Sequence, residues 1–475
     1  MEFTQVLWDV IRTELEDVVG VENVILDRAD LITHGNDTFW LTYQYIENGK
    51  APTLPNIVVL PGSTEEVSRV LQICNYYKLP VVPFGGCSGG QGGATPFAGG
   101  VSLDMKRMNR ILEIDEYSRT VTVEAGVIFQ QLEWRVNELG YSTMHIPSSI
   151  TCSTVGGFLA HNGIGVLSTK YGKIDDMCIW LEAVIPDGTV LDTAPVPKHS
   201  SGPYLKDIFI GSEGTYGVIT KAKFRLFQLP QTRQFHAFLF KDLSTALKAG
   251  RDLVHECRPS ILRLYDENET KSVIKDVVGV EKPGVFMNIA VEGMEKIVDI
   301  EHEHALEVCM GKYGAEDMGE EYGSRWWDHR VTFFYPGHVF QYPKMYGTMD
   351  TISTYDKIED IYWSMKEAVE TNFPQARFLA HFSHWYDWGC MMYDRFIVDH
   401  APEDPMEATR LHNQIWRCGV RTALAHGGVL NDHHGIGIKL GSLMKEQYGS
   451  SMMIYRGLKQ MFDPNGIMNP FKMGV

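Results

Sequence analysis

The sequence predicts a two-domain protein of the α+β class. The chain has 475 residues, more than a single hydrophobic core usually organises. Residues 56–84 alternate strand, helix and strand at close spacing, whereas after Pro230 strand-like and amphipathic helical segments follow one another. The later pattern is typical of an antiparallel sheet covered by helices, so we place a domain boundary near residue 230.

The elements of the first part follow from hydrophobic spacing and from turn residues. Apolar residues recur at three- and four-residue steps over 5–19, which predicts an N-terminal helix. Ser63, with Glu66 three residues later, forms a capping box that starts a helix ending near Tyr77. Apolar runs and alternation predict one more helix at 129–139 and strands at 56–60, 79–84, 101–104, 119–126, 180–185 and 190–191.

The same criteria predict the elements of the second part. Strand-like segments occur at 235–240, 261–265, 285–291, 377–385 and 389–398. Helical periodicity occurs at 244–257, 296–313, 356–372 and 404–420.

Composition and charge exclude several classes of protein. The net charge of −17 makes the chain a poor candidate for binding nucleic acid or an anionic membrane surface. The eight cysteines form no C-x-x-C pair, which argues against a zinc ribbon or a disulfide scaffold. The chain begins without the pattern of a signal peptide and contains no apolar stretch long enough to span a bilayer. We therefore expect a cytoplasmic protein.

Glycine-rich loops dominate the first part. The predicted strand at 79–84 leads into six glycines within residues 85–93. Glycine permits positive φ and close approach of the backbone to a ligand, and successive N–H groups can form a nest for phosphate. The spacing matches neither G-x-G-x-x-G nor the P-loop. Further glycine blocks at 156–165, 211–217 and 435–437 suit a ligand as long as a dinucleotide.

The order of five motifs resembles the flavin-binding domain of the vanillyl-alcohol oxidase superfamily. These motifs are residues 59–67, 85–93, 147–163, 211–220 and 462–470. Within it, the chain most resembles the branch of FAD-linked D-lactate and glycolate dehydrogenases and alkyl-dihydroxyacetone-phosphate synthase, from Ile57 to Lys472. The resemblance implies a two-subdomain FAD-binding domain of the VAO/PCMH type with a substrate (cap) domain. The expected divisions are 1–50 (N-terminal helical segment), 51–230 (FAD-binding domain), 231–455 (substrate domain) and 456–475 (C-terminal return to the FAD-binding domain).

The resemblance implies FAD as the cofactor. Some relatives tether the flavin through a histidine in the first loop, and Cys87 stands at the matching place. We expect noncovalent FAD, with a cysteinyl bond as the alternative. The implied contacts are Pro83, Gly85, Gly86, Cys87, Ser88, Gly89, Gly90, Pro147, Ser148, Ser153, Thr154, Gly156, Gly157, Asn162, Gly163, Gly165, Gly214, Ile219 and Asn469.

Two adjacent histidines, His433 and His434, are candidates for the catalytic base. An imidazole titrates near neutral pH, so it can accept the proton of a substrate hydroxyl. The segment 432–435 (Asp-His-His-Gly) resembles the branch's active-site loop, which is Glu-His-Gly in lactate-type enzymes and His-His-His-Gly in the synthase. The alternative is a pair of solvated loop histidines.

A third cluster, at 381–393, contains further candidates. Lactate-type relatives carry a metal-binding motif here, of which His384 is retained while Met391 replaces the second histidine. A divalent metal therefore remains a candidate cofactor, with His384 and His433 as its ligands. Tyr393 falls near the tyrosine that the synthase uses for catalysis. The alternative is a strand with aromatic core packing.

Arg263 alternates with apolar neighbours and is expected to point away from the core. The resemblance places it near the substrate, where a guanidinium binds a carboxylate or phosphate; the alternative is pairing with Asp266 or Glu267. Relatives carry a second arginine after a Pro-Tyr-Leu stretch. The most similar segment of this chain, 335–338, has no arginine. Aromatic residues in the same part favour a bulkier or more apolar pocket than lactate needs, namely Trp326, Trp327, Phe333, Phe334, Phe340, Trp385 and Trp388.

These features predict an FAD-dependent oxidoreductase acting on a small molecule with a hydroxyl-bearing carbon, either a 2-hydroxy acid or an alcohol. Its C–H hydride would pass to flavin N5 while a histidine or Tyr393 takes the hydroxyl proton, giving the carbonyl product. The alternatives are a flavin-dependent ether-forming transferase like the synthase, or a non-catalytic flavoprotein. The expected electron acceptor is oxygen, a quinone or an electron-transfer flavoprotein. We also expect a homodimer, because dimers are common among the relatives.

Overall fold

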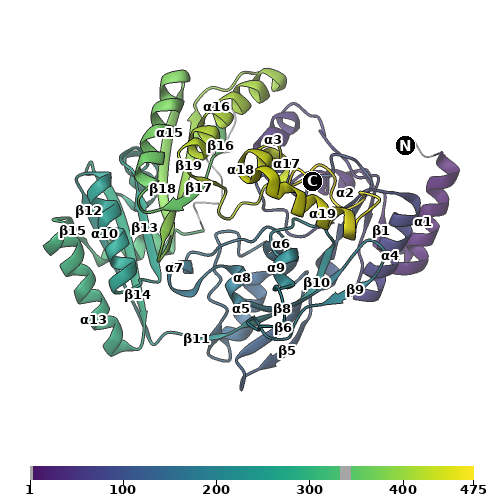
Figure 1. The fold of residues 1–475 in the computed structure, drawn as a ribbon, viewed down its shortest axis with the longest axis horizontal. Helices are drawn as coiled ribbons and strands as arrows, with labels where there is room; N and C mark the ends of the chain where they lie inside the picture. Colours follow the sequence, from purple (N-terminus) through teal and green to yellow (C-terminus); the bar gives the residue numbers. More distant parts are fainter. Residues whose placement is uncertain (1–3, 332–343) are drawn as a thin grey trace.

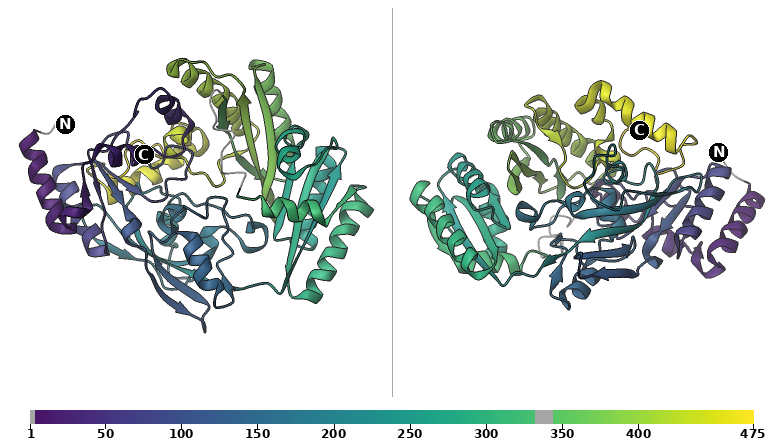
Figure 2. Two further views of the ribbon diagram at one scale, coloured as in Figure 1. Left: turned by 180° about the vertical axis from the view of Figure 1, so that it is seen from behind. Right: turned by 60° about the horizontal axis from the view of Figure 1, so that its bottom comes forward.

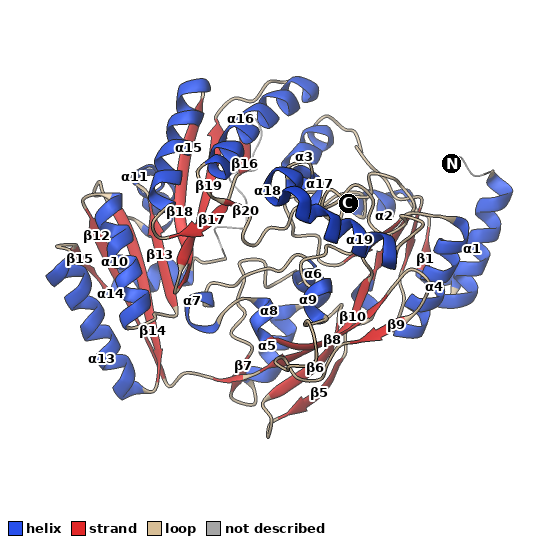
Figure 3. Cartoon of the chain, in the orientation of Figure 1, coloured by secondary structure: helices blue, strands red, loops and turns tan. Residues whose placement is uncertain are grey.

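The computed structural model describes residues 4–331 and 344–475. Figure 1 shows one large sheet with its helices on the left and two smaller sheets on the right. The glycine-rich loops run between these two parts. This arrangement confirms the α+β class, and the cartoon in Figure 3 shows that both parts mix helices and strands.

The first small sheet has the strand order β1-β2-β4-β3. The inner pairs β2–β4 and β4–β3 are parallel, as expected for strands joined by a crossover helix. That helix is α4, which Ser63 caps by accepting a hydrogen bond from the Glu66 N–H at 3.2 Å. The elements are α1 (Gln5–Val19), β1 (Val24–Ile25), α2 (Arg28–Thr33), α3 (Trp40–Glu47), β2 (Ile57–Val59), α4 (Thr64–Tyr77), β3 (Val81–Phe84) and β4 (Val101–Asp104).

The second sheet, β5-β6-β10-β8-β9, is antiparallel throughout. Its central strand β10 follows the third glycine block and was not predicted as a strand. Helices α5 and α6 contribute to its core through Phe129, Val136 and Phe158. The elements are β5 (Ile111–Asp115), β6 (Thr120–Glu124), α5 (Phe129–Asn137), β7 (Tyr141–Ser142), α6 (Val155–Ala160), α7 (Ser168–Tyr171), α8 (Ile174–Met177), β8 (Cys178–Val184), β9 (Val190–Asp192), α9 (Lys206–Phe209), β10 (Val218–Arg225) and β11 (Phe227–Gln228).

The large sheet contains nine strands in the described part of the chain, and its assigned pairings are antiparallel, as predicted. Its order is β15-β12-β14-β13-β18-β19-β17-β20, with β16 paired to β19. The strands are β12 (Thr232–Phe240), β13 (Ile261–Tyr265), β14 (Val285–Gly293), β15 (Glu316–Gly319), β16 (Met345–Thr348), β17 (Thr351–Thr354), β18 (Ala376–Tyr386), β19 (Gly389–Val398) and β20 (Val429–Leu430).

Most helices of this part cover one face of the sheet, and the other face is turned toward the glycine-rich loops. In β13, Leu262 and Leu264 pack into the core beneath the helices, while Arg263 points to the opposite face because side chains alternate along a strand. The predicted direction of Arg263 is therefore correct. The helices on the face of Leu262 are α10 (Leu243–Glu256), α13 (Glu295–Leu306), α15 (Ile358–Asn372) and α16 (Pro405–Ala425). The helices α12 (Lys275–Val278) and α14 (Glu320–Asp328) pack on the face of Arg263, and the short helix α11 (Glu267–Glu269) follows β13.

The C-terminal segment passes back to the first sheet, and the two views in Figure 2 show the C-terminus lying over the N-terminal half of the chain. It contains α17 (Gly437–Gly441), α18 (Met444–Tyr448) and α19 (Met452–Phe462). Beyond α19, the Val81 N–H donates to the Ile467 carbonyl and the Asn469 N–H donates to the Val81 carbonyl, each at 2.8 Å. Within 4–331 and 344–475, no helix combines the length and the apolar character needed to cross a bilayer.

Candidate active site

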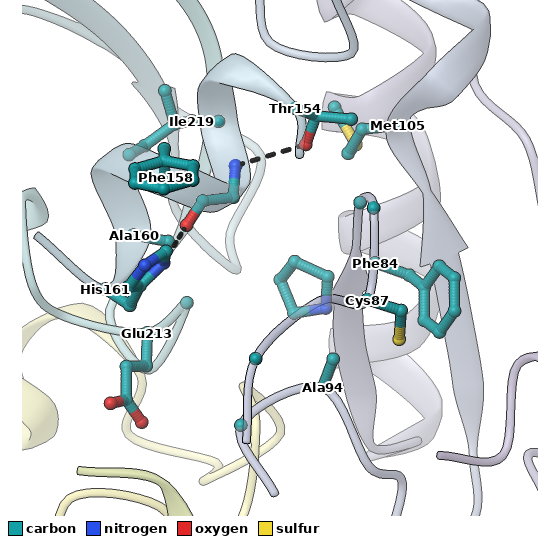
Figure 4. A pocket seen from close by; sticks show the side chains of 18 of the residues that line it. Phe84, Cys87, Ala94, Met105, Thr154, Phe158, Ala160, His161, Glu213 and Ile219 are labelled. Atoms are coloured by element: carbon teal, nitrogen blue, oxygen red, sulfur yellow. Dashed lines mark hydrogen bonds between the residues drawn. The ribbon is translucent and has the colours of Figure 1, made fainter. Parts of the chain in front are cut away.

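A cavity lies where the three glycine-rich blocks meet. In Figure 4, Phe158, His161 and Glu213 line one side of this cavity, and Cys87 and Ala94 line the other. We call it the cradle. Its lining includes twelve of the predicted cofactor contacts: Pro83, Gly85, Gly86, Cys87, Ser88, Gly89, Ser153, Thr154, Gly156, Gly157, Gly214 and Ile219.

The first loop offers the cradle a row of free donors. From Gly86 to Gly93, the backbone N–H groups donate to no acceptor within the described ranges. Unpaired N–H groups of successive residues bind anionic oxygens, as in other phosphate-binding nests. The loop therefore fits the pyrophosphate of a dinucleotide.

Glycine is required where two loops of the cradle touch. A Cβ on Gly86 would lie 2.0 Å from the Cys152 carbonyl oxygen, and a Cβ on Gly156 would lie 2.8 Å from the Ala125 Cβ. Any side chain at Gly86 would push the first two loops apart and change the width of the cradle.

Seven predicted contacts lie elsewhere. Gly90, Pro147, Ser148 and Gly165 line a second cavity, and Asn162 lines a third. A Cβ on Gly163 would meet the Phe158 ring at 2.1 Å, so this glycine permits packing and lines no cavity described. Asn469 donates from Nδ2 to the carbonyls of Gly93 and Glu213, at 2.9 and 2.6 Å, and so links the first and third loops.

Cys87 is poorly suited to attack a flavin. Its thiol donates to the Asn36 carbonyl at 3.1 Å. Burial, followed by the charge of Asp37, raises the pKa of Cys87 well above the usual value for a thiol. Because the thiolate is the reactive form, this environment keeps Cys87 unreactive.

A second cavity, of about 230 Å³, adjoins the cradle and faces the large sheet. Six residues line both cavities: Ser88, Gly89, Gln91, Phe158, His161 and His434. All five predicted catalytic residues line the second cavity: Arg263, His384, Tyr393, His433 and His434. Side chains up to 171 positions apart in the chain are thus gathered beside the cradle.

His434 is held by a buried carboxylate. Its Nδ1 lies 2.9 Å from Oδ1 of Asp350, whose side chain is 1% exposed. Burial raises the pKa of Asp350, but the charge and hydrogen bond of His434 lower it more, so the net pKa is below its usual value. An ionised carboxylate only accepts, so Nδ1 is the donor and Nε2 is left to take a proton from a ligand.

His384 and His433 are neutral imidazoles. Their rings lie 5.2 Å apart, edge to face, and His384 Nδ1 is 2.9 Å from the Ser168 hydroxyl. Burial is the main cause that lowers the pKa of each histidine well below its usual range. The charge of Arg263 lowers the pKa of His384 further, and the charge of His434 lowers the pKa of His433 further.

Carboxylates complete two potential metal-binding groups around these histidines. One consists of His384, Asp432 and His433, the other of Asp350, His433 and His434, with one ligand atom from each residue within 4.8 Å of the others. In the first group, Asp432 Oδ2 and His433 Nδ1 are buried and form no hydrogen bond to any described residue. The sequence indicated only the imidazoles.

Tyr393 is a protonated phenol that faces the histidine pair. Its hydroxyl lies 2.8 Å from that of Tyr346, and its ring centre is 5.0 Å from that of His434. Burial raises the pKa of Tyr393 well above its usual value. Its ring stacks on His381, which contacts Glu269 at 3.1 Å.

Arg263 does not form an ion pair with Asp266 or Glu267, the alternative to its binding a substrate. Asp266 accepts from the Glu269 N–H and the Tyr362 hydroxyl, while Glu267 pairs with Lys271. Arg263 Nε has no acceptor within 4–331 and 344–475, and its guanidinium lies 5.5 Å from the Trp326 ring. Burial lowers the pKa of Arg263 to about 10, so it remains a cation that faces the cavity.

Of the seven aromatics that suggested an apolar pocket, three of the four within the described residues do not line the cavity, although Phe39, Trp40, Tyr265 and Tyr346 do. Trp385 is buried in the core against Gly250, and Trp388 is 52% exposed. Trp327 stacks beneath the guanidinium of Arg330. Among the predicted aromatics that the structure describes, Trp326 lines the cavity and the others do not. Phe333, Phe334, Phe340 and the segment 335–338 lie outside the described residues. Among the residues that the structure describes, four basic side chains also line this cavity, Arg263, Arg330, Arg395 and Lys439, against one carboxylate, Glu269.

Sequence reasoning missed several residues of the site. His161 stands next to Asn162, and Asp432 is the first residue of the Asp-His-His-Gly segment, so their position was a usable signal. His161 lines all three cavities, and burial lowers its pKa to about 4. Nothing in the local sequence marks Asp350 or Lys439.

Comparison with known proteins identifies this architecture. Residues 229–473 match the C-terminal domain of FAD linked oxidases, and residues 55–194 match the FAD binding domain. The chain belongs to the FAD-linked oxidase family. It is a flavoprotein whose cofactor is FAD, and the recognition of the family from its motifs is confirmed.

Three relatives show how far the likeness extends. The uncharacterized FAD-linked oxidoreductase YgcU of Escherichia coli K12 is 32% identical, over 96% of each chain. A probable mitochondrial D-lactate dehydrogenase of Danio rerio is 28% identical over 97% of this chain and 91% of its own. A solved alkyldihydroxyacetonephosphate synthase superposes with a TM-score of 0.82 and 26% identity, covering 98% of this chain and 86% of its own.

Proposed function

We propose that the protein oxidises a hydroxyl-bearing carbon of an anionic small molecule, a 2-hydroxy acid being the simplest such compound. The observation that carries this proposal is the pairing of His434 with Asp350 in a cation-lined cavity that adjoins the cradle. The family and the D-lactate dehydrogenase relative support the same reaction class.

The side chains divide the work as follows. Arg263 holds the substrate carboxylate and thereby orients the hydroxyl-bearing carbon toward the cradle. His434 Nε2 accepts the hydroxyl proton, and Asp350 stabilises the imidazolium that forms. Tyr393, whose ring centre lies 5.0 Å from that of His434, donates a hydrogen bond to the substrate oxygen. Bound noncovalently, FAD supplies the acceptor for the hydride.

The decisive experiment is an anaerobic titration of the purified holoprotein with D-lactate, glycolate and larger hydroxy acids. The flavin absorbance is expected to bleach with at least one of them. A flavin that no hydroxy acid bleaches, but that supports exchange of an ester-linked group for an alcohol, would favour the ether-forming alternative. The synthase relative, and the protonated Tyr393 beside the histidines, are the observations behind that alternative.

We also propose a divalent metal at His384, Asp432 and His433. Two neutral imidazoles and a carboxylate suit zinc, manganese or iron, and the buried atoms Asp432 Oδ2 and His433 Nδ1, which form no hydrogen bond to a described residue, would become ligands. Such an ion polarises a substrate hydroxyl.

Removal of this metal is expected to lower turnover by about tenfold or more without releasing FAD, because the ion acts on the substrate oxygen and not on the cradle. The test is dialysis against a chelator, followed by metal analysis, flavin absorbance and assay before and after adding back each metal. Unchanged turnover in metal-free protein would contradict the proposal. His199→Gln, at a half-buried histidine that does not line the cavity, is the matched control for the variant His384→Gln.

A further inference from the structure

The second cavity runs across four strands of the large sheet. Their order is β13, β18, β19 and β16, and each contributes lining residues, among them Arg263, His384, Tyr393 and Thr348 respectively. The proposed catalytic side chains of β18 and β19 therefore lie in the middle of this row. Arg263 marks one end, and Thr348 marks the other.

A cation is present at each end of the row. Arg263 belongs to β13 itself, whereas Lys439 reaches the other end from α17 and donates from Nζ to the Thr348 carbonyl at 2.9 Å. Neighbouring strands are about 4.8 Å apart, so β13 and β16 are separated by roughly 14 Å. A ligand with an acidic group at each end can extend along this row and offer one group to each cation.

Lys439 lacks a paired anion. No carboxylate lies within 4 Å of its Nζ in the described parts of the chain, and the one carboxylate of the cavity, Glu269, already pairs with Arg395 and His381. Burial lowers the pKa of Lys439 to about 7, although Asp350 and Asp394 act in the opposite direction. Its other neighbours are the Thr348 carbonyl and the Trp416 ring, whose centre is 5.4 Å from Nζ, and an anion in the cavity would stabilise the charged form of this ammonium.

We propose that Lys439 forms a second anion subsite, so that the substrate carries one acidic group toward Arg263 and another, a carboxylate or a phosphate, on the far side of the hydroxyl-bearing carbon. This inference rests on the proposed function and specifies its substrate class. The Thr348 carbonyl uses one of the three ammonium protons, which leaves two for the distal group.

Binding without turnover tests this subsite. The holoprotein is titrated with glutarate or adipate and with the monocarboxylate of equal chain length, and the shift of the flavin spectrum gives each dissociation constant. A third series, monocarboxylates bearing a terminal phosphate, distinguishes the two kinds of distal group. We expect the doubly charged ligand to bind about tenfold tighter than the singly charged one.

The variants separate a binding role from a structural one. Lys439→Met is expected to abolish this preference and leave the monocarboxylate constant unchanged, while Arg263→Met weakens both ligands. Lys445→Met, at an exposed lysine of α18, is the matched control. If Lys439→Met fails to retain FAD, Lys439→Arg takes its place and is expected to keep the preference.

Three results would overturn the subsite: equal affinity for the two charge classes in the unaltered protein, an unchanged preference in Lys439→Met, or equal weakening of both ligands. Failure of every hydroxy acid to bleach the flavin, with the charge preference intact, would instead overturn the proposed oxidation and leave the subsite standing.

Discussion

Replacing His434 with glutamine is expected to lower the rate of flavin reduction by about 10²- to 10⁴-fold and to leave FAD bound. The reason is that His434 lines both cavities and that Asp350 fixes its Nδ1 as a donor, so Nε2 is the proton acceptor. The measurement is stopped-flow absorbance with whichever hydroxy acid bleaches the unaltered protein.

Two further variants control this result. Asp350→Asn is expected to lower kcat with little change in KM, because a neutral amide still accepts the Nδ1–H bond but no longer stabilises the imidazolium. His426→Gln changes an exposed histidine that lines neither cavity, and turnover is expected to persist. Normal reduction in His434→Gln would exclude this residue as the base and shift the role to His433 or Tyr393.

Replacing Gly86 with alanine is expected to yield protein that retains little or no FAD. The added Cβ would lie 2.0 Å from the Cys152 carbonyl oxygen, a backbone atom that cannot rotate away, so the two loops of the cradle must separate. The measurement is the ratio of flavin to protein absorbance after purification, followed by titration of the apoprotein with FAD.

The matched control is Gly457→Ala in α19, where the new Cβ would meet nothing within 4 Å. This change is expected to leave flavin content unchanged and to stabilise the helix by roughly 0.5–1 kcal/mol. A full complement of FAD in Gly86→Ala would mean that the first loop does not hold the cofactor as proposed.

Local signals in the sequence predicted most individual elements. The helix at 5–19, the helix capped by Ser63 and the strand at 389–398 are correct because hydrophobic period and capping chemistry act over a few neighbouring residues. The short strand at 345–348 was missed, because a run of four residues gives too little periodicity to distinguish it from a loop. The two-fold alternation of β13 also gave the direction of Arg263.

The sequence predicted contacts between side chains less well than it predicted helices and strands. The sequence did not decide whether Arg263 forms an ion pair with Asp266 or Glu267, because residues close in the chain need not be close in space. In the structure Asp266 caps the next helix, and Glu267 pairs with Lys271 along it. The aromatics misled for a similar reason, since composition does not reveal whether a tryptophan packs into the core, as Trp385 does, or into a cavity.

The sequence by itself determined the family and the cofactor, since these depend on contiguous motifs. It also located the first glycine loop, where the close approach of Gly86 to Cys152 leaves no room for a Cβ. Tertiary structure alone decided the partner of His434, because Asp350 lies 84 positions away in the chain and reaches the histidine only after β16, β17 and β20 join one sheet. It likewise brought Lys439 and Arg263 to opposite ends of one cavity, a consequence of strand order that no local pattern encodes.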